Sequence, residues 1–237
     1  MTQAAADSEF KYAGSELELF EKARNWKKYW RAQIAEFVGG DVLEVGAGIG
    51  ANTLTLSGLT FDRWTCLEPD AALAARIILP PGDRHRPAAG TIDDLPREAR
   101  FDAILYIDVL EHIEDDRREM ALAADRLKPG GALIVLAPAH PFLFTPFDSA
   151  IGHVRRYTRA SLRSVAPKSI RIEKLGYLDA AGLLASAGNR LVLRKSMPKA
   201  WQILAWDRLG VPLSRLLDPL FAGRLGKSVL GIWRKER

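Results

Sequence analysis

The sequence predicts an α/β protein built on a doubly wound, mostly parallel sheet. Three observations support this: strand-like and helix-like segments alternate, a glycine-rich turn follows the first strand, and 237 residues suffice for one such domain. We expect seven strands, near residues 41–46, 63–68, 84–88, 101–107, 131–138, 169–178 and 226–234. Helices are expected between them near 50–58, 70–78 and 115–127. Ligands of such sheets bind beyond the carboxyl ends of the strands.

A helix is also expected before the first strand. Within residues 15–38, apolar side chains recur at helical spacing on one side: Leu17, Phe20, Ala23, Trp26, Trp30, Ile34 and Phe37. We therefore divide the chain into an N-terminal cap helix, residues 1–40, and a domain formed by residues 41–237.

The turn after the first strand has the composition of a nucleotide-binding turn. Gly46, Gly48 and Gly50 carry no Cβ, so the backbone there can approach a ligand closely. Glu68 ends the next strand, where it could accept hydrogen bonds from a ribose. The spacing Gly46-x-Gly48-x-x-Ala51 fits a dinucleotide site, as in NAD(P)-dependent oxidoreductases. Glu44 instead favours a cationic ligand such as a sulfonium, and a ligand-free turn is the third interpretation.

Five segments in chain order resemble the class I S-adenosylmethionine-dependent methyltransferase superfamily. They are Glu44–Gly50, Glu68–Asp70, Gly90–Pro96, Phe101–His112 and Leu127–Pro138, which together span the middle half of the chain. The resemblance implies the Rossmann-like methyltransferase fold, the small-molecule branch of the family, and S-adenosyl-L-methionine as cofactor. The cofactor-binding residues that it implies are Asn25, Tyr29, Glu44, Gly46, Gly48, Glu68, Pro69, Thr91, Ile92 and Asp108. Thr91 stands where many members carry Asp, so backbone groups of Thr91 and Ile92 are expected to bind adenine.

A helical insertion is expected before the last strand, at residues 180–225. Leucine, tryptophan and arginine are interleaved there, and Pro198, Pro212 and Pro219 should divide it into short helices. Residues 151–237 hold 18 of the 34 Lys and Arg residues but 5 of the 29 Asp and Glu residues. Such an asymmetry indicates an anionic partner, or simply a solvated basic face. The insertion is expected to pack as an extra layer; a lid, a dimer surface and a patch on an anionic membrane remain open.

The acceptor is expected at residues 139–165, a loop and helix after the fifth strand. His153 and His140 are candidate general bases for an oxygen nucleophile. The predicted acceptor-binding residues are Phe144, Arg155, Arg156 and Tyr157, with the arginines holding an anionic group. His112 follows the fourth strand and is expected to position the turn.

Other features of the sequence exclude several classes of function. The four histidines show no metal-ligand spacing, so methyl transfer without a metal is expected. No nucleic-acid-binding motif is present, and the single cysteine, Cys66, permits no disulfide framework. With no signal peptide or transmembrane run, the expected location is the cytoplasm, with peripheral contact at the inner membrane face as a further hypothesis.

The sequence thus predicts an S-adenosylmethionine-dependent methyltransferase. Its acceptor is expected to be a small molecule, glycan or lipid-like compound with an anionic group, methylated on oxygen, while nucleic acid is not expected. Two alternatives stay open: a NAD(P)-dependent oxidoreductase, and a non-catalytic cofactor-binding protein at a membrane surface.

Overall fold

A seven-stranded sheet forms the centre of the protein. The computed structural model describes residues 22–192 and 200–236. The strands are β1 Asp41–Val45, β2 Arg63–Glu68, β3 His85–Ala89, β4 Phe101–Ile107, β5 Leu127–Pro138, β6 Ile170–Leu178 and β7 Ser228–Lys235. Their order is β3-β2-β1-β4-β5-β7-β6, and all pairs are parallel except those that β7 makes with β5 and β6. The predicted doubly wound, mostly parallel sheet is confirmed.

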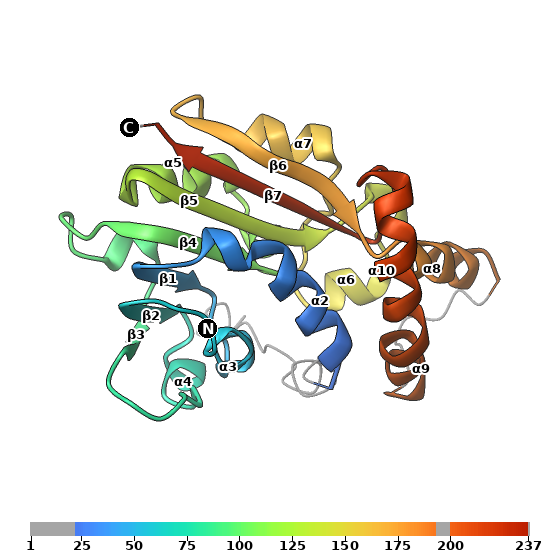
Figure 1. The fold of residues 1–237 in the computed structure, drawn as a ribbon, viewed down its shortest axis with the longest axis horizontal. Coiled ribbons are helices and arrows are strands. Elements are labelled where there is room, and N and C mark those ends of the chain that lie inside the picture. Colours follow the sequence, from blue (N-terminus) through green and yellow to red (C-terminus); the bar gives the residue numbers. More distant parts are fainter. Residues whose placement is uncertain (1–21, 193–199, 237) are drawn as a thin grey trace, which may run out of the picture.

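Helices cover both faces of the sheet (Figure 1). The α-helices are α2 Arg24–Ile34, α3 Ala51–Leu56, α4 Ala71–Ala74, α5 Asp116–Arg126, α6 Pro146–Ala150, α7 Arg159–Val165, α8 Ala180–Val192, α9 Ala200–Ala205 and α10 Val211–Phe221. Short 3-10 turns occupy Ala35–Phe37, Ile92–Asp94, Leu110–His112 and Pro141–Leu143, and one π-helical turn spans Trp206–Gly210.

The alternation of side chains along each strand divides the core into two layers. On β1, Val42 packs in the layer that holds Trp26 and Trp30 of α2, while Leu43 packs in the layer of α5 and α7. Neighbouring strand residues point to opposite faces of a sheet, so a strand buried on both sides is apolar throughout. This explains why residues 103–107 of β4 and 132–137 of β5 are continuous apolar runs.

The insertion between β6 and β7 forms α8, α9, the π-helical turn and α10. Figure 1 shows these elements gathered beyond one end of β6 and β7. Two of its prolines do not divide helices as predicted: Pro212 lies in the first turn of α10, where no N–H is needed, and Pro219 lies inside that helix near its end. Pro198 falls outside the described residues.

Buried carboxylates fasten the insertion to α2. Asp207 of the π-helical turn accepts hydrogen bonds from the side chain of Asn25 and from the backbone N–H of Trp26, the latter at 2.9 Å. Asp218 of α10 accepts a 2.7 Å hydrogen bond from the hydroxyl of Tyr29. Because buried carboxylates are costly unless they are hydrogen-bonded, these contacts hold the cap helix and the insertion as one layer.

Three elements differ from the prediction in length. The described part of the cap helix is Arg24–Ile34 followed by a 3-10 turn, and residues 15–21 lie outside the described ranges. The helix expected over 70–78 ends at Ala74, because the chain turns so that the N–H of Ile78 can bond the carbonyl of Ile49. Strand β5 begins four residues early, because Leu127 already pairs with Phe101 across an irregularity in β4.

Within the described ranges no helix has the length and apolar character needed to cross a bilayer. The thiol of Cys66 is buried in the core, which raises its pKa to about 12 and makes it unreactive near neutral pH.

Candidate functional site

The glycine turn between β1 and α3 leaves a cradle at the carboxyl edge of the sheet. Gly46, Gly48 and Gly50 all have positive φ, at 68°, 57° and 89°. A Cβ on Gly46 would lie 2.6 Å from a methyl carbon of Val109, so glycine is required there by packing. A Cβ on Gly48 would meet no described atom within 4 Å, so the backbone at this position faces open space that a ligand can occupy.

Glu68 borders this cradle from the end of β2. Its carboxylate accepts hydrogen bonds from the backbone N–H groups of Gly48, at 2.8 Å, and of Asp70, at 3.1 Å. Burial raises its pKa. Glu68 ends β2 and Pro69 follows it, so both residues lie at the carboxyl edge of the sheet, beside which the sequence predicts the ribose of a nucleotide.

Glu44 lies beneath the turn with its side chain buried. One carboxylate oxygen accepts hydrogen bonds from Thr53 at 2.7 Å and from the indole N–H of Trp64 at 2.8 Å. The other oxygen has no partner among the described residues. Burial raises the pKa of Glu44 to about 7, and the positive charge of Lys27 opposes this shift. Glu44 therefore keeps one oxygen for a further donor.

Part of the backbone of the predicted adenine-binding loop is hydrogen-bonded within the loop itself. Both the N–H and the hydroxyl of Thr91 donate to the carboxylate of Asp94, at 2.7 and 2.8 Å, which forms a capping box around Ile92–Asp94. The side chain of Ile92 is buried in the core. The Thr91 N–H, predicted to bind adenine, is thus already engaged in this structure.

Asn25 and Tyr29 lie in a different place from the one the sequence predicts. Their polar groups face the insertion, through the hydrogen bonds to Asp207 and Asp218 described above. Sequence reasoning placed them at the cofactor because the partners of α2 lie more than 180 positions away and leave no local signal. Their cofactor-binding role is a prediction that this geometry does not favour.

Asp108 follows β4 next to the glycine turn, and we call the surroundings of its exposed side chain the recess. It has a left-handed φ of 56°, an uncommon conformation for a residue other than glycine. Its side chain remains accessible to solvent although protein surrounds it closely, and this crowding raises its pKa to about 6. The positive charges of His153, Lys227 and Lys27 oppose the shift, so these groups lie near Asp108.

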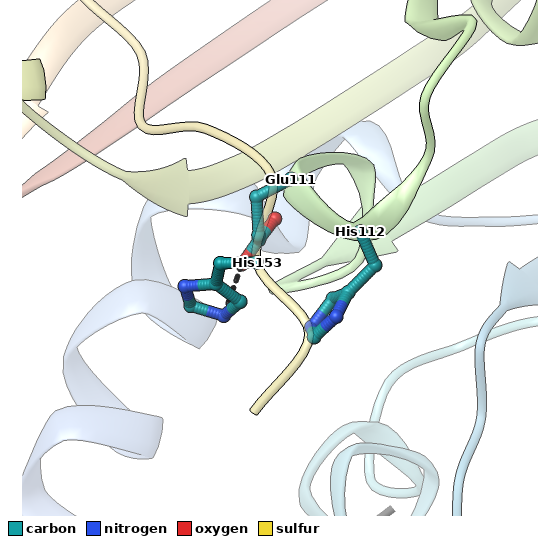
Figure 2. A group of neighbouring side chains, drawn as sticks. All are labelled: Glu111, His112 and His153. Carbon is teal, nitrogen blue, oxygen red and sulfur yellow. Dashed lines mark ion pairs between the residues drawn. The ribbon is translucent and has the colours of Figure 1, made fainter. Parts of the chain in front are cut away.

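Glu111, His112 and His153 gather at this recess (Figure 2). Nε2 of His153 lies 3.7 Å from a carboxylate oxygen of Glu111, and the rings of His112 and His153 meet edge to face with centroids 4.6 Å apart. Glu111 is fully buried, and burial raises its pKa well above the usual range. Burial lowers the pKa of His112 to about 4. One donor atom from each residue lies within 4.8 Å of the others, so the three side chains could hold a metal ion.

A carboxylate behind His153 fixes its orientation. Nδ1 of His153 donates to Asp148 at 3.0 Å, and Asp148 also accepts from Arg156 and from Thr145. Burial alone would raise the pKa of Asp148, but hydrogen bonds from His153 and Arg156 outweigh it and hold the pKa well below its usual range. Nε2 of His153 is therefore the ring nitrogen that points toward Glu111.

His140, the other predicted base, is engaged elsewhere. Its Nε2 lies 2.9 Å from the carbonyl oxygen of Gly226, and its ring packs against Tyr177 of β6 at 4.6 Å. Its φ of 65° marks a sharp turn after β5. The contacts of His140 join the end of β5 to the start of β7, which favours a structural role over a catalytic one.

The predicted acceptor-binding residues are tied into the protein itself. Arg155 donates to the carbonyl oxygens of Ile113 and Glu114, and it pairs with Asp116 at 2.6 Å. Tyr157 is buried and donates to Asp116 at 2.7 Å. Arg156 is paired with Asp148 at 2.8 Å, so neither arginine presents the unpaired guanidinium that anion binding was expected to use. Phe144 is half-buried after the 3-10 turn that follows β5.

Sequence reasoning missed two groups that the fold brings to the recess. Glu111 was passed over beside His112, although a Glu-His pair directly after a strand was a usable signal. Lys227, just before β7, carries no local motif; its ammonium lies 4.8 Å from the centre of the Trp206 ring, and burial lowers its pKa. Only the antiparallel return of β7 beside β5 brings it close to Asp108.

Comparisons with known proteins agree with this geometry. A family model described as a methyltransferase domain matches residues 19–169. The demethylmenaquinone methyltransferase of Tropheryma whipplei is 28% identical over 159 residues, which are 65% of this chain and 61% of that protein. The ubiquinone biosynthesis O-methyltransferase of Rickettsia bellii is 26% identical over 97 residues, 40% of each chain. The chain thus spans less than two thirds of the length of these relatives.

Solved structures share the fold. The N-methyltransferase NodS from Bradyrhizobium japonicum in complex with S-adenosyl-L-homocysteine has a TM-score of 0.61 at 17% identity, covering 97% of this chain and 100% of that one. A methyltransferase crystallised with the Trm112 activator of Haloferax volcanii has a TM-score of 0.66 at 15% identity, covering 99% and 100%. The family model and the curated relatives do not favour the NAD(P)-dependent oxidoreductase that the glycine spacing leaves open.

Proposed function

The chain belongs to the S-adenosylmethionine-dependent methyltransferases of class I, and we propose that it methylates a hydroxyl oxygen of a small, lipid-like acceptor. One observation carries the proposal. Asp108 lies between the glycine cradle and the cluster of Glu111, His112 and His153: the next residue, Val109, packs on Gly46, and the carboxylate of Asp108 interacts electrostatically with His153 and Glu111. This arrangement would let a methyl donor in the cradle meet an oxygen activated by the cluster.

The cradle fits S-adenosylmethionine by its shape and its acceptors. The open space at Gly48 accommodates a ligand, and Glu68 at the end of β2 is a carboxylate for the ribose hydroxyls. The buried oxygen of Glu44 without a partner would accept a hydrogen bond from the amino-acid end of the cofactor, directly or through water. When bound, the cofactor supplies an activated methyl group on a sulfonium.

The residues of the recess then have two tasks. They must align the acceptor oxygen with the methyl carbon, and they must help to remove the hydroxyl proton. The acceptor oxygen forms a bond to the methyl carbon while the carbon–sulfur bond breaks and sulfur keeps the electron pair. We propose that His153 acts on the acceptor oxygen, since Asp148 holds Nδ1 and turns Nε2 toward Glu111 (Figure 2), next to Asp108.

The names of the relatives suggest the class of acceptor. One is a demethylmenaquinone methyltransferase and the other a ubiquinone biosynthesis O-methyltransferase. We therefore propose an aromatic hydroxyl on a quinol-type lipid. Oxygen is favoured over carbon as the methylated atom because the recess carries a buried carboxylate and two imidazoles, groups suited to activating a hydroxyl. Any anionic group of the acceptor would meet Lys227, since Arg155 and Arg156 are already paired.

Peripheral membrane contact belongs to the same proposal. Large apolar side chains are exposed along α9, the π-helical turn and α10: Trp201, Leu209, Leu213, Leu216, Leu220 and Phe221. Exposed arginines lie between them, including Arg208 and Arg215. This combination suits the surface of an anionic membrane, from which a lipid acceptor would be drawn. Flotation with anionic and neutral vesicles measures this contact, and equal recovery with both would contradict it.

Transfer of a labelled methyl group tests the function. The purified chain is incubated with labelled S-adenosylmethionine and, in parallel, with a catechol-type quinol, the same quinol with its hydroxyls already methylated, and a primary amine. We expect label in the product of the free quinol alone, with S-adenosylhomocysteine released in equal amount. Label on a ring carbon of the capped quinol, or on the amine, would contradict oxygen methylation. Binding of S-adenosylhomocysteine is measured by calorimetry in parallel. Binding without methyl transfer would show that the acceptor is wrong, whereas absence of binding would show that the protein preparation is inactive.

A further inference from the structure

The cluster at the recess has the composition of a metal site. It is formed by Glu111 and His112, from the 3-10 turn after β4, and by His153, from the loop after α6 (Figure 2). Its donor atoms are two imidazole nitrogens and one carboxylate oxygen, all within 4.8 Å of one another. Two His and one carboxylate form a common ligand set of catalytic zinc and of non-heme iron.

Glu111 is the observation that most requires an explanation. Its side chain is fully buried, yet neither carboxylate oxygen has a hydrogen-bond partner in another described residue. A buried carboxylate without a partner is strongly unfavourable. His153 alone does not satisfy it, because 3.7 Å is too long for a hydrogen bond. A cation between Glu111 and the two imidazoles would satisfy both oxygens.

Both imidazoles are held from behind, as metal-binding histidines usually are. Asp148 accepts a hydrogen bond from Nδ1 of His153 at 3.0 Å, which turns Nε2 toward Glu111. His112 forms a hydrogen bond with the backbone of Gly152 through its ring. In metal sites, such a carboxylate or carbonyl behind each histidine fixes the tautomer and aims the other nitrogen at the ion. The arrangement around Asp148 is thus the support that a ligand needs.

We propose that Glu111, His112 and His153 bind one divalent transition-metal ion of the zinc class. Ligand atoms around tetrahedral zinc are about 3.3 Å apart, given bonds of about 2.0–2.1 Å. The Nε2–oxygen distance of 3.7 Å is close to this value, and the widest separation requires a closure of about 1.5 Å. With three protein ligands, a tetrahedral ion would keep one coordination position open.

The role of this ion rests on the function proposed above. An acceptor hydroxyl bound at the open position has a lowered pKa and releases its proton to water near neutral pH. The resulting oxyanion attacks the methyl carbon, and the sulfonium sulfur keeps the electron pair of the broken bond. With the ion bound, His153 acts on the acceptor oxygen through the metal, as a ligand, and not directly as the general base that the sequence predicts, because the metal occupies Nε2.

Cobalt binding tests the site without any acceptor. The chain is stripped with a chelator and titrated with Co²⁺, and visible absorption reports tetrahedral coordination. We expect one ion per chain, displaced by Zn²⁺, and a loss of affinity of at least about a hundredfold in Glu111→Gln and His153→Ala. Glu119→Gln is the matched control, because Glu119 is a buried glutamate of α5 that accepts a hydrogen bond from Tyr106, outside the cluster.

A measurement on the unmodified protein avoids dependence on variants. Histidine acylation is mapped by mass spectrometry with and without Zn²⁺. We expect Zn²⁺ to protect His112 and His153 and to leave the labelling of His85, on β3, unchanged. Absence of stoichiometric Co²⁺ or Zn²⁺ binding by the wild-type chain, or equal labelling with and without Zn²⁺, would overturn the proposal. Because neither measurement uses an acceptor, a wrong choice of acceptor does not change what either one shows about metal binding.

Discussion

The two sides of the recess are built by different means. On the cofactor side, the conformation of the backbone determines the shape of the site. Gly46, Gly48 and Gly50 adopt positive φ, and the carboxylate of Glu68 accepts hydrogen bonds from backbone N–H groups of the turn and of Asp70. On the acceptor side, charged side chains determine the shape of the site, because Asp148 accepts hydrogen bonds from both His153 and Arg156. A site built on backbone leaves a motif in the sequence, whereas a site built on paired side chains does not. Substitutions on the two sides should therefore change different properties of the protein.

The acceptor side is tested by His153→Ala. We expect turnover to fall about a hundredfold, equivalent to about 3 kcal/mol, because this side chain activates the acceptor oxygen, either directly or as a ligand of the proposed metal ion. Affinity for S-adenosylhomocysteine should stay within about threefold, since the cofactor side is untouched. Methyl-transfer kinetics at saturating cofactor and calorimetry measure the two quantities. His85→Ala, at the far edge of the sheet, is the control; unchanged turnover in His153→Ala would remove this residue from the mechanism.

The buried carboxylate of the cofactor side is tested by pH. The pKa of Glu44 is about 7 in the folded protein, against 4.5 when unperturbed. A raised acid pKa means that the folded state holds a proton that the unfolded state has lost, so stability falls as pH rises from 4.5 to 7. This fall amounts to about 3 kcal/mol and should be absent in Glu44→Gln.

Urea unfolding at several pH values in this window gives the difference between the two proteins. Taking that difference cancels the contribution of other buried acids, such as Glu119. If the free energy of unfolding changes with pH in the same way for wild type and Glu44→Gln, Glu44 ionises in the folded protein as it does in the unfolded chain.

The glycine turn is tested by a matched pair of substitutions. Gly46→Ala should cost about 2–3 kcal/mol of stability, because a Cβ both strains the positive φ and overlaps Val109. Gly48→Ala should cost about 1 kcal/mol, since only the φ is strained. Both should weaken cofactor binding. In Gly48→Ala the new methyl group points into the cradle, and in Gly46→Ala the overlap with Val109 displaces the turn. Thermal unfolding and calorimetry separate the effects; equal destabilisation would show that Val109 can move aside.

The smallest effect is expected for Tyr29→Phe. The variant loses one hydrogen bond to Asp218, which keeps the backbone N–H groups of Asp179 and Ala180 as donors, so the cost should be about 1 kcal/mol. Cofactor affinity should not change, because the hydroxyl faces the insertion. A loss of affinity of tenfold or more would instead place Tyr29 at the cofactor, as the resemblance to the family implies.

The sequence predicts what local patterns encode. Strand positions, the glycine turn and Glu68 follow from apolar periodicity and from the absence of Cβ atoms, and the structure confirms the fold. The partners of Arg155 and Tyr157 could not be predicted, because Asp116 lies about 40 positions away and charge pairing has no periodicity. For the same reason, Asn25 and Tyr29 were placed at the cofactor when their partners lie in the insertion. Glu111 was missed because its significance depends on burial, which only the packed structure reveals.

The geometry of the β6–β7 hairpin makes the insertion exchangeable. Leu178, which ends β6, and Ser228, which begins β7, are paired neighbours in the sheet. The insertion therefore departs from and returns to adjacent points, and replacing it by a tight turn would leave the strand register intact. A longer, shorter or different insertion can therefore be accommodated at this point while the strands that carry the glycine turn and Glu68 keep their positions. The contacts of the insertion with the rest of the domain, such as those of Asp207 and Asp218 with α2 and of Trp206 with Lys227, would have to be rebuilt each time.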